Sequence, residues 1–485
     1  MVKNYINAEW VASTATASTD VINPATGELL DRCPVGGAAD VETAVQAAAA
    51  AFPAWRRVPV IERVQPLFKL KALMQTHLEE LARQVTIEHG KTLAEALGSV
   101  KRGIQMLETA CGMPSLMMGE FSEDIAVGID SQAVRTPMGV FAAIAPFNFP
   151  AMVPFWFWPF AVAAGNTFVL KPSERVPLSQ QRIFALIEQC GFPKGVINMV
   201  NGGKDVVNAL LAHPQIIGVS FVGSTPVAKH VYTTGTAHLK RVQALGGAKN
   251  FMVALPDAPL DASARTAFES ITGCAGERCL AGSVILCVGA DTYAAFQKRL
   301  IPIATDTNIG NGLDPNVQMG PLISQAAKDR VKGLIQSAVD DGAELLVDGR
   351  KNVDQVPGYF LRPTLIGKVT PNMRVAQEEI FGPVVLLAQV ATMQEAIQWI
   401  NRSPYANTTT LFTASGAAAR AFCYEVAPSM IGINIGVPAP MAFFSFGGSK
   451  ESFFGDVKAH GNACINFFTD TKVTITRWEK DGSIW

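Results

Sequence analysis

The stretch "GVFAAIAP" (residues 139–146) is a continuous run of small and branched apolar residues that ends at a proline. A run without alternating polar positions is typical of a strand that is buried on both faces. Four similar runs follow it: "NTFVLKP" (166–172), "VINMVNG" (196–202), "IIGVSFVGS" (216–224) and "KRVQALGG" (240–247). Helices are predicted between these runs, near residues 178–190, 204–212 and 226–237. This alternation predicts a parallel, doubly wound sheet that binds its ligand at the carboxyl ends of the strands.

A second alternating series lies further along the chain. Its predicted strands lie near residues 283–289, 343–347, 384–391, 408–414 and 430–436. Its predicted helices lie near residues 291–304, 324–341, 393–402 and 416–426. Two other pieces, "VGIDSQAVRTPM" (127–138) and "CINFFTDTKVTITRW" (464–478), have the period-two pattern of extended strands. We expect these two pieces to be exchanged between subunits.

The composition is that of a globular protein, because 49% of the 485 residues are hydrophobic and 17% are charged. The formal net charge of −1 provides no basic surface for nucleic acid. The apolar stretch at residues 151–170 is long enough to cross a membrane, but Pro154 and Pro159 interrupt it. We therefore predict a buried helix followed by a buried strand, and no association with membrane. The first residues lack the apolar core of a secretory signal, so a cytoplasmic location is expected.

Eight cysteines are scattered through the chain, a pattern that favours free thiols in a reducing compartment. Two of them, Cys274 and Cys279, lie five positions apart in "GCAGERCLAG" (273–282). They form no C-x-x-C pair and no histidine lies nearby, so a disulfide and a metal site are both disfavoured and no metal is expected. On this segment alone, Cys279 is either a nucleophile or a small buried residue. Cys274 is expected to be buried and unreactive.

The turn after "VSFVGS" has the features of a phosphate site, although no G-x-G-x-x-G fingerprint occurs in the chain. Thr225 is a good N-cap residue, and Pro226 suits the first position of a helix. Gly223, which Ser224 follows, lets a ligand approach the backbone, and the free N–H groups of a helix N-terminus attract a pyrophosphate. The alternative, an ordinary capped turn between a strand and a helix, stays open on the local sequence.

The segment "KPSE" (171–174) ends another predicted strand. Lys171 and Glu174 are suited to bind ribose hydroxyls by hydrogen bonds. A carboxylate at this place would repel a 2′-phosphate and therefore favours NAD over NADP. The alternative for this segment is a solvated loop.

Several segments occur in the order found in one enzyme superfamily. They are "NPATGE" (23–28), "APFNFP" (145–150), "KPSE" (171–174), "FVGST" (221–225), "LGG" (245–247), "GERC" (276–279) and "EEIFGPV" (378–384). On these motifs, the sequence resembles the aldehyde dehydrogenase superfamily along nearly its whole length. Four further segments are similar to the CoA-acylating malonate- and methylmalonate-semialdehyde dehydrogenase branch: "PSLMMGE" (114–120), "APFNFPAMVPFWFWP" (145–159), "GGAKNFMV" (246–253) and "FFGDVKAHG" (453–461).

The resemblance implies an aldehyde dehydrogenase-like α/β fold with two doubly wound domains and a small β oligomerisation arm. Residues 1–126 and 139–247 are expected to form the NAD-binding domain, and residues 248–436 the catalytic domain. Residues 127–138 and 464–485 are expected to form the arm. A homo-oligomer, either a dimer or a tetramer, is expected on the same basis.

The resemblance also implies roles for single residues. Cys279 is the expected nucleophile, and Asn148 together with the backbone N–H of Cys279 is expected to stabilise the thiohemiacetal oxyanion. The residues expected to bind NAD are Ala145, Phe147, Lys171, Glu174, Gly223, Ser224, Glu379 and Phe381. Arg102 and Arg278 are expected to hold the substrate carboxylate by guanidinium pairing, although Arg102 also suits a solvated helix face. Arg278, or the positive charge of the cofactor, is expected to lower the pKa of Cys279.

One departure from the superfamily pattern decides the expected product. The general-base glutamate of the superfamily begins a Glu-Leu-Gly-Gly stretch, and Ala244 stands at that place here. The CoA-acylating branch also lacks this glutamate. Water needs a positioned base to break a thioester, whereas the thiol of coenzyme A needs less help. The resemblance therefore implies oxidation of malonate or methylmalonate semialdehyde to acetyl-CoA or propionyl-CoA, with loss of CO2.

Two alternatives stay open on the sequence. One is a hydrolytic, NAD-dependent aldehyde dehydrogenase that recruits another base such as Glu277 and gives a free carboxylic acid. The other is a protein that keeps the fold without catalysis.

Overall fold

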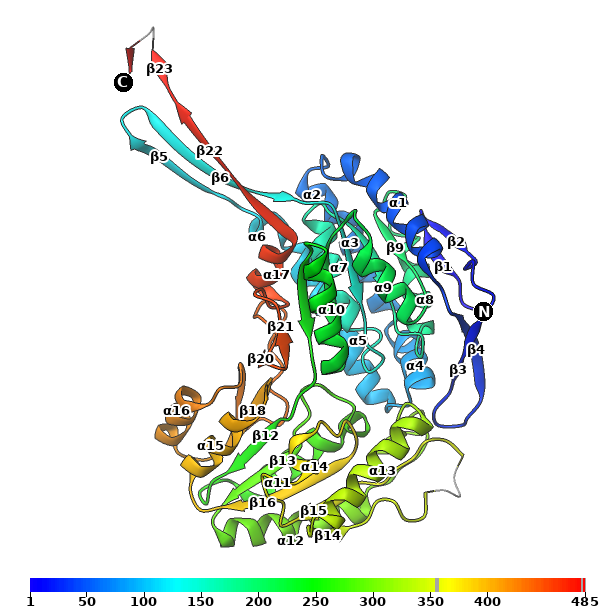
Figure 1. The fold of residues 1–485 in the computed structure, drawn as a ribbon, viewed down its shortest axis with the longest axis vertical. Coiled ribbons are helices and arrows are strands. Elements are labelled where there is room, and N and C mark those ends of the chain that lie inside the picture. Colours follow the sequence, from blue (N-terminus) through cyan, green and yellow to red (C-terminus); the bar gives the residue numbers. More distant parts are fainter. Residues whose placement is uncertain (354–356, 481–482, 485) are drawn as a thin grey trace.

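The computed structural model describes residues 1–353, 357–480 and 483–484. Two large sheets with their helices form the body of the molecule, and a thin three-stranded sheet projects from it (Figure 1). Residues 481–482 and 485, which belong to the expected arm, lie outside the described residues.

The first sheet has eight strands, of which the central ones run parallel. In spatial order these are β2 (Glu9–Val11), β1 (Asn4–Ile6), β9 (Ile197–Met199), β8 (Thr167–Lys171), β7 (Val140–Ile144), β10 (Ile216–Val222), β11 (Arg241–Leu245) and β21 (Phe453–Phe454). Strands β7 to β11 confirm the five apolar runs read from the sequence. The strand order reverses between β7 and β10, because β8 and β9 extend the sheet on one side of β7 and β10 and β11 on the other. Such a reversal marks the preferred ligand site of a doubly wound sheet.

Helices cover both faces of the first sheet, and successive residues of β7 alternate between two apolar clusters. One face is covered by α1 (Ala38–Trp55), α9 (Lys204–Ala212) and α10 (Thr225–Ala237). The other face is covered by α3 (Gln65–Thr76), α4 (Leu78–His89), α5 (Leu93–Cys111), α7 (Trp158–Ala163) and α8 (Leu178–Ile187). The apolar stretch at 151–170 forms a short 3-10 helix, η1 (Val153–Trp156), then α7 and then β8, as predicted. Among the described residues, no helix has the length and apolar character needed to cross a membrane.

Helix α5 begins with a capping box that fixes its direction. The Thr92 hydroxyl accepts a hydrogen bond from the Glu95 N–H at 3.3 Å, and the Glu95 carboxylate accepts one from the Thr92 N–H at 3.0 Å. The apolar face of α5 packs into the core beneath the first sheet. Arg102 lies two turns further along the same helix.

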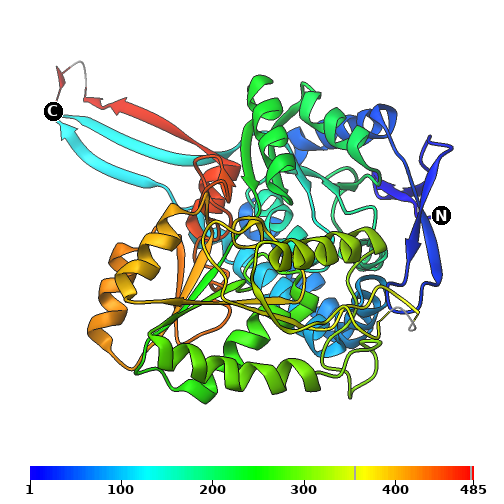
Figure 2. The ribbon, with the colours of Figure 1, turned by 60° about the horizontal axis from the view of Figure 1, so that its bottom comes forward.

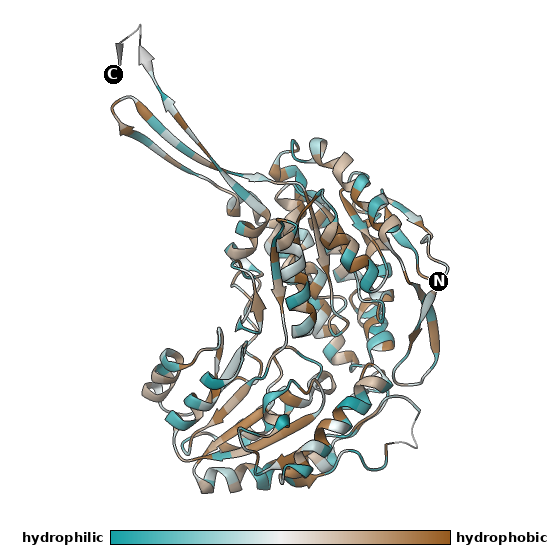
Figure 3. Ribbon diagram, in the orientation of Figure 1, coloured by the Kyte–Doolittle hydropathy of each residue, from teal (hydrophilic) through white to brown (hydrophobic). Residues whose placement is uncertain are grey.

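The second sheet has seven strands and is also mainly parallel (Figure 2). In spatial order these are β14 (Glu344–Val347), β15 (Thr364–Gly367), β16 (Val384–Val390), β13 (Val284–Val288), β12 (Phe251–Ala254), β18 (Thr408–Phe412) and β19 (Met430–Ile433). Its faces are covered by α11 (Leu260–Thr272), α12 (Ala290–Asp306), α13 (Gln325–Asp340), α15 (Met393–Arg402) and α16 (Gly416–Glu425). Figure 3 shows that hydrophobic residues concentrate in these strands. The sequence analysis missed β12 and β15, which have only four residues each.

The projecting arm is an antiparallel sheet in the order β22-β6-β5. Its strands are β5 (Glu120–Ala126), β6 (Ile129–Pro137) and β22 (Thr469–Arg477). Residues 464–468 were expected to be extended, and this prediction is wrong, because they belong to α17 (Gly461–Phe468). Cys464 and Phe468, four positions apart, are both fully buried against the body, so tertiary burial selects the helix over the strand.

Candidate functional site

The segment that carries Cys279 enters the amino end of β13 through an unusual backbone. It begins with η2 (Gly273–Gly276), in which Cys274 and Ala275 have φ values of 52° and 53°. Both values lie in the left-handed region, which costs energy for residues other than glycine. Gly276 also has a positive φ, and a Cβ atom there would lie 2.2 Å from the carbonyl oxygen of Gly382. The close approach of these two backbones therefore requires glycine.

Two asparagines hold the backbone of Cys279. The Nδ2 atoms of Asn250, which precedes β12, and Asn407, which precedes β18, each donate to the Cys279 carbonyl oxygen at 2.9 Å. Asn250 Nδ2 also donates to the Ala281 carbonyl oxygen at 2.8 Å. The nucleophile segment is thus fixed against two neighbouring strands. Neither asparagine was identified from the sequence, although Asn250 lies within the segment "GGAKNFMV".

The thiol of Cys279 is neutral in this arrangement. Burial, followed by the nearby Glu379 carboxylate, raises the pKa of the Cys279 thiol to about 12. Arg278 acts in the opposite direction, but its effect on this pKa is the smallest of those that act on the thiol. Arg278 thus lowers this pKa as expected, but burial outweighs its effect. Its guanidinium is engaged elsewhere, since Nη2 lies 3.2 Å from Oε1 of Glu95.

Asn148 connects the first sheet to the nucleophile segment. It follows β7, and its Nδ2 donates to the carbonyl oxygen of Glu277 at 3.0 Å. The main-chain carbonyl oxygen of Asn148 accepts a hydrogen bond from Nζ of the buried Lys91 at 2.6 Å. The structure therefore brings Asn148 against the segment that ends in Cys279, and Lys91 was not identified from the sequence.

Most of the residues expected to bind the dinucleotide lie at the carboxyl edge of the first sheet. This edge contains Ala145 and Phe147 after β7, Lys171 and Glu174 at the end of β8, and Gly223 and Ser224 after β10. The N-cap of α10 is Ser224, so the prediction that Thr225 is the N-cap is wrong by one position. The Thr225 hydroxyl instead accepts a hydrogen bond from the Gly247 N–H at 2.9 Å, which joins the two sheets.

Lys171 and Glu174 form an ion pair at the carboxyl end of β8. Nζ of Lys171 lies 2.9 Å from Oε2 of Glu174, and the side chains are 5% and 38% exposed respectively. Burial opposes ionisation of Glu174, but the Lys171 cation outweighs this effect and holds the pKa of the carboxyl below its usual value. The edge therefore presents a fixed, ionised carboxylate.

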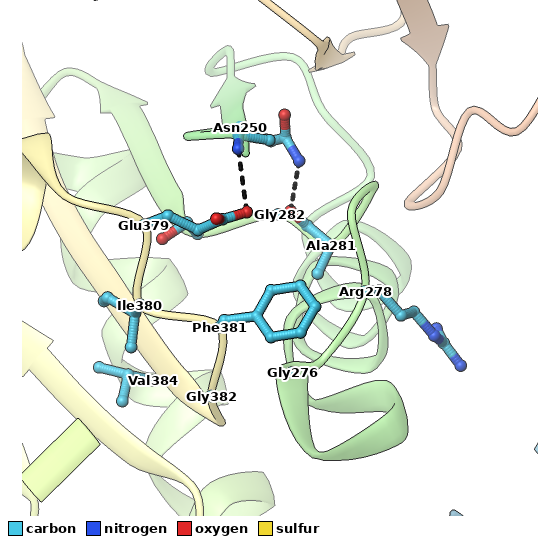
Figure 4. A pocket seen from close by; sticks show the side chains of 12 residues that line it. Asn250, Gly276, Arg278, Ala281, Gly282, Glu379, Ile380, Phe381, Gly382 and Val384 are labelled. Carbon is cyan, nitrogen blue, oxygen red and sulfur yellow. Dashed lines mark hydrogen bonds between the residues drawn. The ribbon is translucent and has the colours of Figure 1, made fainter. Parts of the chain in front are cut away.

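Glu379 and Phe381 lie on the segment that enters β16 and face the first sheet. Figure 4 shows them near Asn250 and Ala281, with the Arg278 side chain extending away. The Glu379 carboxyl accepts a hydrogen bond from the Ala248 N–H at 2.9 Å, and removal from water raises its pKa to about 7. The ring of Phe381 meets that of Phe147 edge-on, with centroids 6.0 Å apart. The aromatic pair joins residues that the sequence places in different domains.

A cavity of about 250 Å³ adjoins Cys279. We call it the Arg102 cavity; its wall includes Arg102, Arg278 and Cys279 as well as Met106, Trp156 and His460. Most of its other side chains are apolar. The structure thus brings both arginines expected to bind a carboxylate to the same cavity as Cys279.

The Arg102 guanidinium has uncharged partners among the described residues. It donates to Oε1 of Gln105 at 2.9 Å and to the carbonyl oxygen of Ala439 at 3.2 Å, and it also contacts the carbonyl oxygen of Pro440 and the sulfur of Met441. The alternative of a solvated helix face is therefore not what the structure shows. Arg102 is partly buried and lines the wall of the Arg102 cavity.

Glu277, the base suggested for a hydrolytic enzyme, does not line the Arg102 cavity. Its side chain is fully buried, and one carboxyl oxygen accepts a hydrogen bond from the Ile323 N–H at 3.3 Å. The other lies 3.9 Å from Nε2 of His89. Burial raises the pKa of Glu277 to about 8, so the group is mainly protonated at neutral pH. Ala244 lies in β11, paired with Phe221 and Phe454, and contributes no base.

Cys274 is buried, as expected, but it contacts charged groups. Nε of Arg278 lies 3.4 Å from its sulfur, and its N–H donates to Oε1 of Glu95 at 2.6 Å. The eight cysteines are all free, and the part of the chain that the structure describes contains no cluster of His, Cys, Asp and Glu side chains that could hold a metal ion.

Comparison with known proteins places this geometry in a family. The model of the aldehyde dehydrogenase family matches residues 10–474. Malonate-semialdehyde dehydrogenase 2 of Geobacillus kaustophilus is 47% identical over 478 residues, which cover 98% of this chain and 99% of that protein.

Solved structures agree with the sequence relatives. Methylmalonate-semialdehyde dehydrogenase from Oceanimonas doudoroffii superimposes with a TM-score of 0.97 at 43% identity, over 99% of each chain. The NAD⁺ complex of aldehyde dehydrogenase from Bacillus cereus superimposes with a TM-score of 0.94 at 29% identity, over 99% of this chain and 97% of that one. Since the family model covers most of the chain and the full-length relative is 47% identical, this chain belongs to the aldehyde dehydrogenase family.

Proposed function

We propose that this protein oxidises malonate semialdehyde or methylmalonate semialdehyde with NAD and coenzyme A. The products are acetyl-CoA or propionyl-CoA, CO2 and NADH. The observation that carries the proposal is the Arg102 cavity, in which the Cys279 thiol shares a wall with two guanidinium groups. A thiol suits an aldehyde and a guanidinium suits a carboxylate, and a semialdehyde has both groups. Similarity to malonate-semialdehyde dehydrogenase of Geobacillus kaustophilus supports the same substrate class.

The residues at the carboxyl edge of the first sheet fit NAD. The ion pair of Lys171 and Glu174 suits ribose hydroxyls, and the N-terminus of α10, with Gly223 and Ser224, suits a pyrophosphate. When bound, NAD supplies the hydride acceptor. In this proposal the first sheet with its helices is the NAD-binding domain and the second sheet with its helices is the catalytic domain.

Four residues suit the nicotinamide end of the cofactor. Ala145 and Phe147 come from the first sheet, and Glu379 and Phe381 from the second, where the two aromatic rings meet edge-on. The Glu379 carboxyl can accept hydrogen bonds from ribose hydroxyls, and the rings exclude water from the space beside Cys279. Water-free surroundings strengthen every electrostatic interaction at the reacting atoms.

Cys279 performs the chemistry in this proposal. The thiol gives up its proton to solvent, a step that the positive charge of bound NAD would favour, and the thiolate then attacks the aldehyde carbon. The N–H of Cys279 and Nδ2 of Asn148 stabilise the oxyanion that forms. One such donor lowers the barrier by about 3 kcal/mol. Loss of a hydride from the thiohemiacetal leaves a thioester on Cys279. Arg102 and Arg278 hold the carboxylate until it leaves as CO2.

Thiolysis is the proposed route of release. Water needs a base to attack a thioester. Ala244 provides none, and Glu277 is buried away from the cavity that contains Cys279. Glu95 lines this cavity, but its carboxylate oxygens are engaged by Arg278 and by the N–H groups of Cys274 and Thr92. Coenzyme A therefore accepts the acyl group.

A rapid-mixing experiment tests the proposal. Without coenzyme A, we expect a burst of about one NADH per Cys279 and then a slow phase, because the thioester accumulates. With coenzyme A, NADH formation should continue at a constant rate. Desulfo-coenzyme A, which lacks the thiol, is the matched control and should give only the burst. Full turnover without coenzyme A would instead establish a hydrolytic enzyme.

We also propose that the arm joins subunits into a homo-oligomer. All residues of β5 are exposed, and the arm exposes large apolar side chains that include Phe121, Val473 and Ile475. A thin sheet with exposed apolar residues and open edges is stable when another chain covers it. Light scattering of the purified protein tests this, since a monomer would contradict it.

A further inference from the structure

Lys249 lies in the short linker between β11 and β12, which joins the two sheets. Its side chain is buried, and its Nζ donates to two main-chain carbonyl oxygens, that of Val375 at 2.7 Å and that of Glu378 at 2.9 Å. Both acceptors belong to the stretch that leads through α14 (Arg374–Gln377) to Glu379. The amine of Lys249 is therefore bound to the backbone directly before Glu379.

The same linker also holds the side chain of Glu379. The Ala248 N–H donates to the carboxyl at 2.9 Å. A Cβ atom at Gly247 would lie 2.5 Å from Oε2 of Glu379, so the carboxyl packs against a residue that must lack a side chain. Asn250, at the end of the linker, binds the Cys279 carbonyl oxygen. Successive residues of the linker thus fix Glu379 and Cys279 relative to each other.

Arg330 supports the same stretch from α13. Its Nη1 donates to the carbonyl oxygen of Glu379 at 3.2 Å, and its Nη2 donates to that of Ile380 at 2.6 Å. Two basic side chains therefore bind three successive carbonyl oxygens, those of residues 378 to 380. Phe381 follows with a φ of 50°, which is strained for a residue other than glycine and persists only where surrounding contacts hold it.

A buried lysine does not by itself indicate a role in the chemistry. Lys240 is also buried, and its Nζ also donates to two main-chain carbonyl oxygens, those of His213 and Ile216. That contact lies at the amino ends of β10 and β11, opposite the edge that suits NAD. Lys249 differs because its acceptors lead to Glu379. Burial lowers the pKa of Lys249 to about 7, and the charge of the Glu379 carboxylate acts in the opposite direction.

We propose that Lys249 is a positioning residue for hydride transfer, because it fixes Glu379 where the carboxyl can hold the nicotinamide ribose. This inference rests on the proposed function. Lys249 contacts neither substrate nor cofactor and acts through Glu379, and Arg330 supports the same placement. An error of about 1 Å in the placement of a reacting group can lower a rate about a hundredfold. The affinity for NAD, by contrast, depends mainly on the first sheet.

A double-mutant cycle on the first turnover tests this inference. Lys249→Met keeps the length of the side chain and deletes the amine, and Glu379→Ala deletes the carboxyl. In Lys249→Met, the rate constant of the NADH burst without coenzyme A should fall about 10- to 100-fold, whereas the Kd for NAD, measured by titration calorimetry, should change less than about threefold. In the double variant the burst rate constant should equal that of Glu379→Ala alone, because Lys249 has no other route to the chemistry.

Lys240→Met is the matched control, because it deletes the same kind of contact away from Glu379. Its burst rate constant should be that of wild type. Arg330→Gln decides the question if Lys249→Met unfolds, since Arg330 is exposed and its replacement leaves the core intact. This variant should also slow the burst, and its effect should vanish when Glu379 is alanine. Thermal unfolding identifies the folded variants.

The outcomes separate the inference from the proposed function. If Lys249→Met slows the burst by the same factor with and without the Glu379 carboxyl, its role is structural and the inference is overturned. An unchanged burst in folded Lys249→Met overturns it as well. A wild type that oxidises propanal but not malonate semialdehyde contradicts the proposed substrate, and the cycle measured with propanal then decides the inference. If wild type forms NADH from neither aldehyde, both fail.

Discussion

The two sheets meet edge to edge, and the edge that each presents to the other is formed by opposite ends of its strands. The first sheet presents the carboxyl ends of its strands, which carry Lys171, Glu174 and the N-terminus of α10. The second presents the amino ends of its strands, where the segments carrying Cys279 and Glu379 enter. Topology explains this arrangement, because only residues 246–250 join the end of β11 to the start of β12. A linker this short brings the carboxyl edge of one parallel sheet against the amino edge of the next.

In the proposed function, the first edge binds the cofactor and the second edge carries out the chemistry. A carboxyl edge leads into helix N-termini, whose N–H groups bind anions with ordinary backbone geometry. The amino edge is entered through irregular segments in which Cys274, Ala275 and Phe381 adopt positive φ values. Such segments are strained, and they place a thiol and a carboxyl where regular strands would not. The comparison predicts that changes on one edge leave the task of the other edge intact.

Removal of the proposed nucleophile, Cys279, should have the largest effect and should leave NAD binding at the first edge unchanged. Cys279→Ala is expected to lower kcat/KM for the semialdehyde by at least about 10⁴-fold, because no other group forms the thioester. Its affinity for NAD, measured by titration calorimetry, should stay within about twofold of wild type.

The exposed Cys423 provides the control for this experiment. Cys423→Ala should keep full activity, since the side chain lies on the surface of α16. Loss of NAD affinity in Cys279→Ala would break the comparison, because the two edges would then not act independently. If Cys279→Ala keeps its activity, Cys279 is not the nucleophile.

Glu277 is buried at the amino edge of the second sheet, and this burial should make the stability of the protein depend on pH. Burial raises the pKa of its carboxyl to about 8 in the folded protein, against about 4.3 in an unfolded chain. Between these two pH values the Glu277 carboxyl is protonated in the folded protein and ionised in the unfolded chain. Its contribution to the free energy of unfolding is therefore fully present below about pH 4 and is lost as the pH rises to about 8. Glu277→Gln removes this dependence. Relative to wild type, the variant should gain on the order of 4 kcal/mol of unfolding free energy between pH 5 and pH 8.

Chemical denaturation at the two pH values measures this difference. Glu28→Gln, which changes an exposed carboxylate, should show no comparable gain. If the stability difference between Glu277→Gln and wild type is the same at pH 5 and pH 8, the Glu277 carboxyl is ionised in the folded protein. A charged carboxylate beside the nucleophile segment would reopen the hydrolytic alternative.

Much of the fold was predictable because long apolar runs leave few choices. The strands from β7 to β11 each follow from a run that only a sheet covered on both faces can bury. The four-residue strand β12 was missed because so short a run resembles a loop. Residues 464–468 were read as extended, and only their burial under the first sheet shows that they are helical. Tertiary packing overrides local pattern in such short segments.

The candidate site was predictable where a motif carries the residue and not where a distant contact decides its role. Cys279, Asn148 and Glu379 came from short motifs whose order resembles a family. The pairing of Arg278 with Glu95 joins residues 183 positions apart, and no local pattern reveals it. The contact of Lys249 with the carbonyl oxygen of Glu378 likewise joins residues 129 positions apart.

The smallest expected effect concerns the carboxyl edge alone. Glu174 is ionised and fixed by Lys171, so its charge should repel the 2′-phosphate of NADP. Glu174→Gln keeps the shape of the side chain and removes the charge. Because the group is partly exposed, the ratio of kcat/KM for NAD to that for NADP should fall only about fivefold. The burst of NADH in the absence of coenzyme A, which depends on the amino edge, should keep its amplitude of about one per Cys279. An unchanged cofactor ratio would mean that the end of β8 does not contact the ribose. Cofactor binding at the first edge would then depend on the N-terminus of α10 alone.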